Sequence, residues 1–223
     1  MTERKVFDEQ LHALKDDLVK LASRVSEQIG AATEGLLDAD LAVADRVYSQ
    51  HDEIFEQSHQ VEAEAYQIFA LQQPMAADLR TLLAALRILH EIELTAGLMR
   101  NVARGTRRLY PAALPPRIRG ILERMGRQAT VMMHLAIDSF ADSDVAAAAA
   151  IADMDDVMDD LQKELFRAIF AEGAPDESAL QRAVQISFVG RDYERAADHA
   201  VMIGRWVGFV VTGTMPGATD STA

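Results

Sequence analysis

Two pairs of acidic residues with helical spacing occur in the second half of the sequence. Asp155 and Asp159 form one pair, and Glu194 and Asp198 form the other. Residues four positions apart lie on the same face of a helix, so each pair directs two carboxylates the same way. If the two helices pack together, four carboxylates converge, and such a cluster removed from water needs protons or a cation. Oxygen ligands alone suit magnesium, calcium, manganese or iron.

The same residues have a plainer interpretation. Asp155 and Asp159 belong to a run of five aspartates between positions 153 and 160, which is typical of a solvated helix face. Arg191 and Arg195 are close enough in the sequence to neutralise the other pair without a metal. Spacing alone leaves both interpretations open.

Two further patterns imitate the Glu-x-x-His ligands of di-iron helical bundles. They are Glu9-x-x-His12 and Glu56-x-x-His59, and both lie beside the apolar stripes rather than on them. We therefore expect these side chains to face water.

Glu93 lies within an apolar stripe and needs a partner. Arg100 or Arg104 is the expected partner, in an ordinary buried ion pair.

Six long helices are predicted to carry these residues. Leucine and valine recur at steps of three and four, as at positions 11, 14, 18, 21 and 25, which makes one apolar stripe along a helix. Aspartates at 38, 40, 142 and 144 precede two of the helices and can cap free backbone N–H groups. The expected ranges are 7–36, 41–69, 75–109, 117–140, 145–172 and 176–212.

The two halves of the chain repeat one pattern. Asp38-x-Asp40 recurs as Asp142-x-Asp144 at an offset of 104, and Glu93 recurs as Glu194 at an offset of 101. Prolines at 111, 115 and 116 separate the copies, because proline interrupts helices. An internal repeat of this length predicts an all-α fold, a tandem repeat of two three-helix bundles at 5–110 and 115–213. Residues 214–223 are small and polar and are predicted to form a disordered tail.

Composition excludes several classes of protein. The 223 residues carry a net charge of −13, which disfavours binding to nucleic acids or to anionic membranes. There is no cysteine, so any metal must be held by oxygen or histidine. The start of the sequence lacks the apolar core of a secretory signal, and the most apolar stretch, 196–211, is too short to span a bilayer. We expect a cytoplasmic protein.

The sequence resembles the PhoU family over residues 5–213. In that family the third helix of each repeat carries Asp-Leu-Arg and, after about a dozen mainly apolar residues, Glu-Arg-Ile-Gly-Asp. The first copy here has Asp78-Leu79-Arg80 and then a stretch from Glu93 to Gly97. The second copy has Glu194-Arg195-Ala196-Ala197-Asp198. The ending from Trp206 to Gly213 is also similar to the family's ending.

The resemblance carries a metal-site expectation to one repeat only. Some members of the family bind iron or zinc clusters on Glu/Asp-x-x-x-Asp motifs. The corresponding positions of the second repeat are all acidic: Asp155, Asp159, Glu194 and Asp198. Those of the first repeat are His51, Phe55, Glu93 and Gly97. Because Phe55 and Gly97 offer no ligand atom, we expect at most one site, holding iron, zinc or another divalent cation.

The resemblance also implies a function. PhoU proteins act as negative regulators of phosphate uptake and phosphate-regulon signalling, between the phosphate ABC transporter, chiefly its ATPase subunit, and a sensor histidine kinase. The resemblance implies no catalysis, and contact with the membrane only through partners. It also implies a homodimer, to which the glycine-containing edge of the helix at 176–212 contributes. The alternatives are a metal-storage or scaffold protein and a metal-dependent enzyme using the same carboxylates, for which His199 is the available general base.

Overall fold

The computed structural model describes residues 3–72 and 74–216 of the chain. These residues form six helices and no strand, which confirms the predicted all-α fold. Each predicted helix is present, with ends displaced by at most a few residues. The helices are α1 (Glu3–Leu37), α2 (Leu41–Gln72), α3 (Ala77–Leu109), α4 (Pro116–Asp142), α5 (Val145–Glu172) and α6 (Glu177–Thr212).

The start of the middle helix of each repeat is fixed by the same cap. Asp40 Oδ1 accepts hydrogen bonds from the amides of Ala42 and Val43 at 2.8 and 3.1 Å. Asp144 Oδ1 accepts the equivalent bonds from the second and third residues after it, at 2.9 and 3.0 Å. Each aspartate satisfies two amides that the helix itself leaves without partners. The first of the two repeated aspartates does not cap, since Asp38 pairs instead with Arg119 at 2.6 Å.

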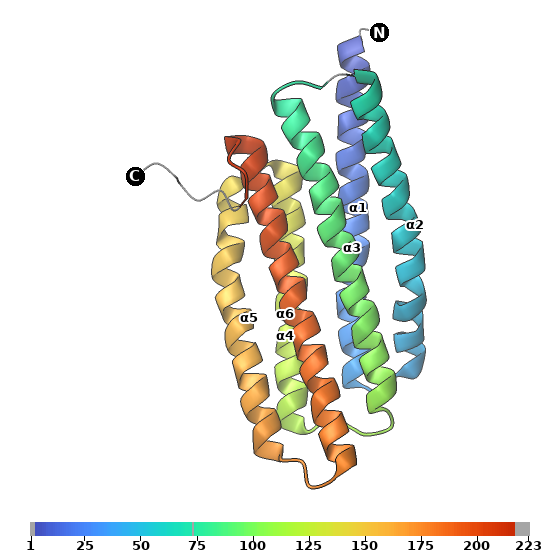
Figure 1. Cartoon of the computed structure of the whole chain (residues 1–223), viewed down its shortest axis with the longest axis vertical. Coiled ribbons are helices and arrows are strands. Elements are labelled where there is room, and N and C mark those ends of the chain that lie inside the picture. The colour runs from blue at the N-terminus through green and yellow to red at the C-terminus, as the bar shows by residue number, and fades with distance from the viewer. Residues whose placement is uncertain (1–2, 73, 217–223) are drawn as a thin grey trace.

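The six helices form two three-helix bundles placed side by side (Figure 1). Helices α1 to α3 pack on one another, and so do α4 to α6. The two bundles meet where α3 contacts α6 and where α1 contacts α4, which leaves α2 and α5 on the two outer flanks. Helices α3 and α6 run antiparallel: Arg80 Nε donates to the carbonyl oxygen of Val210 at one end, and Arg108 Nη1 donates to Gln185 at the other.

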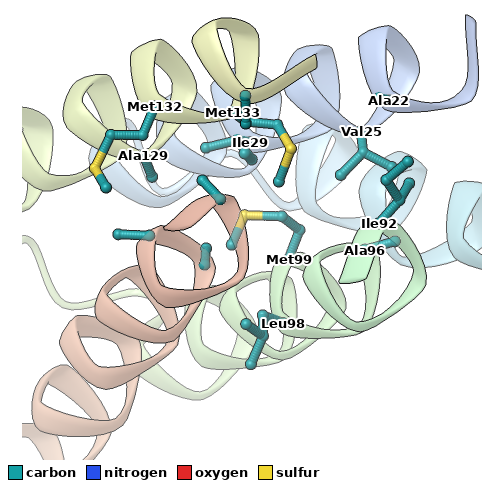
Figure 2. Close-up of a cluster of buried hydrophobic side chains, with 14 of the residues drawn as sticks. Ala22, Val25, Ile29, Ile92, Ala96, Leu98, Met99, Ala129, Met132 and Met133 are labelled. Carbon is teal, nitrogen blue, oxygen red and sulfur yellow. The ribbon is translucent and has the colours of Figure 1, made fainter. Parts of the chain in front are cut away.

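A single apolar core runs through both bundles. Figure 2 shows side chains of α1, α3 and α4 meeting in one cluster, with Met99 and Met133 directed into the space between the helices. Both methionines are fully buried. Each repeat therefore covers apolar surface that the other would otherwise expose to water.

One buried hydrogen bond joins the two repeats inside this core. The hydroxyl groups of Thr33 on α1 and Tyr193 on α6 lie 2.8 Å apart, and the Thr33 hydroxyl also donates to the carbonyl oxygen of Ile29. Tyr193 is fully buried, so its hydroxyl group is removed from water. Thr33 supplies the hydrogen bond that replaces those to water.

Glycines on α6 bring α5 close to it. A Cβ atom added at Gly204 would lie 2.8 Å from the carbonyl oxygen of Ala148, and one added at Gly190 would overlap the side chain of Leu165. Both glycines are buried, so the glycine-containing edge expected to contribute to a dimer is used within the chain. Close approach at these two points sets the register of α5 against α6.

The described chain ends in a short irregular stretch after α6. The stretch 213–215 has no regular structure, and most of the predicted disordered tail, at 217–223, lies outside the described residues. None of the described helices contains a stretch long and apolar enough to cross a lipid bilayer.

We predict opposite effects for alanine at two glycines of α6. Gly204→Ala should lower the free energy of unfolding by about 1–3 kcal/mol, because the added methyl group meets backbone that cannot turn aside. Gly208→Ala is the control, because a Cβ atom there meets nothing within 4 Å. It should raise stability by up to about 1 kcal/mol through helix propensity. Urea unfolding of both variants checks this, and equal effects would contradict the close packing of α5 on α6.

Candidate functional site

The packing of α5 on α6 brings the two predicted carboxylate pairs to the same level. The contacts of Ala148 with Gly204 and of Leu165 with Gly190 fix an antiparallel register. In that register Asp155 lies level with Asp198, and Asp159 lies level with Glu194. All four predicted residues therefore belong to one stretch of the α5–α6 pair, and we call them the carboxylate cluster.

Burial and mutual repulsion act on this cluster. The pKa of Asp155 is raised first by burial and then by the charges of Asp198 and Asp159. Burial also raises the pKa of Glu194, and Asp198 adds to the effect while Arg191 opposes it. The pKa of Asp198 is raised by burial and by Asp159, against a lowering effect of His199. Asp155 and Glu194 are partly buried, which distinguishes them from a fully solvated acidic face, whereas Asp159 and Asp198 are exposed.

Two oxygen atoms of the cluster are buried without a hydrogen-bond partner. They are Asp155 Oδ1 and Glu194 Oε2. The nearest cation to the latter is Arg191, whose Nη1 atom is 4.0 Å away. Such oxygens can accept a hydrogen bond from a donor or coordinate a cation. Among the described residues, however, no three His, Asp or Glu side chains are placed to hold a metal ion together.

The equivalent positions of the first repeat have a different chemistry. His51 stacks on Phe55 with ring centroids 6.2 Å apart, and Phe55 contacts His59 at 4.3 Å. A Cβ atom at Gly97 would lie 3.8 Å from His51 Nε2, so the imidazole occupies the space beside the missing side chain. Arg100 Nη1 lies 3.2 Å from His51 Nδ1. Aromatic stacking and an arginine thus replace three of the four carboxylates.

The predicted partner of Glu93 was wrong. Glu93 accepts a hydrogen bond from Ser58 and lies 3.7 Å from His59 Nδ1 and 3.9 Å from His90 Nδ1. Arg100 is seven residues further along α3, about 10 Å along the helix axis, whereas Ser58 faces Glu93 from the neighbouring helix.

The two Glu-x-x-His patterns lie at the surface, as expected. The side chain of His12 is 79% exposed and that of His59 is 53% exposed. Among the described residues, neither pattern belongs to a group that could hold a metal.

Sequence reasoning missed a buried pair next to the carboxylate cluster. His199 Nδ1 on α6 lies 2.6 Å from Glu91 Oε2 on α3, and both side chains are nearly nine-tenths buried. His199 Nε2 is buried without a hydrogen-bond partner. The contact with Glu91 holds the imidazole of His199 in place between the repeats and leaves Nε2 as its unengaged nitrogen. Only the contact of α3 with α6 reveals this pair, since 108 residues separate the two positions.

The model of the PhoU domain matches the chain twice, at residues 18–106 and 122–207. Two PhoU homologues of Mycobacterium tuberculosis, both named phosphate-specific transport system accessory proteins, are similar over their length. Homologue 2 is 35% identical, covering 96% of this chain and all of the relative, and homologue 1 is 34% identical, covering 96% of each.

Two crystal structures have the same fold. PhoU from Pseudomonas aeruginosa superposes with a TM-score of 0.88 at 28% identity, covering 93% of this chain and all of that one. The phosphate transport system regulatory protein PhoU from Streptococcus pneumoniae gives 0.87 at 22% identity, covering 94% and 99%, which is a likeness of fold. The repeated domain match, the full-length relatives and the six-helix fold together place this chain in the PhoU family.

Proposed function

We propose that this chain is a cytoplasmic negative regulator of phosphate uptake and phosphate-regulon signalling. The supporting observation is the match, over nearly the whole chain, to relatives named phosphate-specific transport system accessory proteins. The regulator acts by contact with the transporter ATPase and the sensor histidine kinase, and it reaches the membrane only through them. It works as a homodimer and catalyses no reaction.

An exposed apolar patch is suited to such contacts. Phe166 and Phe170 end α5, and Leu180 and Val184 begin α6, so the four flank the loop that joins the two helices. Their exposed fractions are 37%, 82%, 55% and 41%. Exposed apolar side chains near one end of a helix pair are suited to contact with a partner protein. The acidic charge of the chain favours basic surfaces on a partner.

A pull-down tests the proposed contacts. We expect the purified chain to retain the transporter ATPase and the sensor kinase, with a difference between phosphate-rich and phosphate-free buffer. Phe170→Ser combined with Val184→Ser should weaken retention at least fivefold, whereas Val131→Ser, which changes an exposed valine on α4, should not. Retention of neither partner, in either buffer, would contradict the proposal.

A gene deletion tests the direction of the regulation. Removing the gene should raise expression of a phosphate-regulon reporter in phosphate-rich medium, because the inhibitory contact with the kinase is lost. A plasmid copy should restore repression. Unchanged expression, in a strain without a second PhoU gene, would contradict a negative role.

As a second candidate function, we propose that the carboxylate cluster binds a divalent cation such as iron, zinc or manganese. The unpartnered oxygens of Asp155 and Glu194 support this, and an all-oxygen set suits hard cations. Binding requires the more exposed Asp159 and Asp198 to turn inward. A cation would remove the repulsion among the four carboxylates and so hold α5 on α6 more firmly.

The raised pKa values lead to a test in which the effect of one substitution on melting temperature depends on pH and on added metal. Because the folded state holds these protons more tightly than the unfolded state, stability falls as pH rises above the ordinary Asp pKa of 3.8. With chelator present, Asp155→Asn should therefore melt higher than the parent chain at pH 8, and the difference should shrink at pH 4. Added Mn²⁺ should raise the melting temperature of the parent chain but not that of the variant.

Asp153→Asn is the control, because Asp153 is exposed on the same helix. It should change neither the melting temperature with chelator nor the response to Mn²⁺. A Mn²⁺ response that survives Asp155→Asn would contradict a site in the cluster.

A further inference from the structure

Four arginines gather in one cleft of a chain that is otherwise strongly acidic. Arg104 and Arg108 of α3 and Arg191 and Arg195 of α6 line a cleft of about 330 Å³ between the two helices. The cleft lies along the seam between the repeats, and Arg108 also lines the neighbouring pocket that contains Val184. In a chain with a net charge of −13, this is a local concentration of positive charge.

In the part of the chain that the structure describes, the two cleft arginines of α3 are not neutralised by a carboxylate, whereas Arg191 of α6 lies 4.0 Å from Glu194. Arg104 Nη2 donates to the hydroxyl group of Tyr48 at 3.4 Å, and Arg108 Nη1 donates to the amide oxygen of Gln185 at 3.3 Å. Both of these hydrogen-bond acceptors are neutral. Among the described residues, neither guanidinium has a carboxylate within 4 Å. Their neighbour Arg107, by contrast, pairs with Asp45 at 2.6 Å.

The one carboxyl group that lines the cleft, that of Asp192, has a raised pKa. Burial raises the pKa of Asp192 to about 6, against the lowering effects of a hydrogen bond from Asn101 and the charge of Arg195. An anion bound beside Asp192 would raise this pKa further and favour the protonated form, so the carboxyl group opposes anion binding less than one with an ordinary pKa.

Packing of the repeats does not require these arginines. The repeat offset of 101 residues relates each position of the cleft to one at the other end of the α3–α6 seam. His90, Leu94 and Phe209 stand there in place of Arg191, Arg195 and Arg108, and only Arg104 has an arginine counterpart. If helix packing alone required arginines here, both ends of the seam would carry similar side chains. The two ends differ.

We propose that the arginine cleft between α3 and α6 binds a phosphate group, either as free orthophosphate or as part of a short phosphate chain. Guanidinium groups match the oxygens of phosphate with paired hydrogen bonds, and a cleft concentrates their field. Arginines from two helices allow an anion to bridge the repeats. The cleft follows from the geometry, whereas the choice of phosphate among oxyanions rests on the proposed function.

Titration calorimetry of the full chain with orthophosphate and with tripolyphosphate, in 150 mM salt, tests the proposal. We expect saturable binding of at least one of the two, and the one that binds distinguishes free phosphate from a phosphate chain. Arg104→Gln combined with Arg195→Gln should weaken that binding at least tenfold. Asp192→Asn, which removes a negative charge from the cleft, should strengthen it.

Arg127→Gln combined with Arg167→Gln is the matched control, because it removes the same charge from exposed positions on α4 and α5. Its affinity should stay within twofold of the parent value. No saturable binding of either anion, or an equal loss in the control, would overturn the proposal. Because no transporter or kinase is present, that result would leave the regulatory function standing, and a failed pull-down would likewise leave the cleft standing.

Discussion

The contact between α3 and α6 is the interaction on which the rest of the structure depends. It runs antiparallel from Arg80 and Val210 at one end to Arg108 and Gln185 at the other. Apolar surface that neither three-helix bundle could cover alone is buried there and in the neighbouring contact of α1 with α4. The seam also aligns the polar groups that cross it, such as the pair of Glu91 with His199. The carboxylate cluster borders this seam, and the arginine cleft opens along it.

The two repeats share a fold but divide its chemistry. The cap formed by Asp40 is reproduced by Asp144, so the backbone of the repeat is kept. All four carboxylates are present only where α5 meets α6, and in the first repeat His51, Phe55 and Gly97 replace three of them. Backbone geometry and core packing tolerate such exchanges because the side chains concerned lie at the margin of the core. The duplicated scaffold can therefore carry the carboxylate cluster in one repeat. In the other repeat it carries stacked aromatic rings and the contact of Arg100 with His51.

Local patterns predicted most of the fold. Helix limits follow from apolar periodicity and from caps, both of which depend on residues within one or two turns. The two pairs of carboxylates were predictable because the spacing within each pair is local, whereas their convergence depended on the packing of α5 on α6. Glu93 was assigned the wrong partner because reach between helices depends on their register, which the sequence does not state. The arginine cleft and the pair of Glu91 with His199 were missed for the same reason, since each joins residues about a hundred positions apart.

The central claim is that the seam makes the two repeats one cooperative unit, and native-state hydrogen exchange tests it most directly. The residues around Leu18 and Val25 of α1, and those around Ala197 and Val201 of α6, are buried deep in the two bundles, so their amides are the ones to follow. The account predicts that both sets exchange with the same free energy of opening, equal to that of global unfolding. If one repeat exchanged at a markedly lower free energy while the other stayed protected, the repeats would be independent domains and the account would be contradicted.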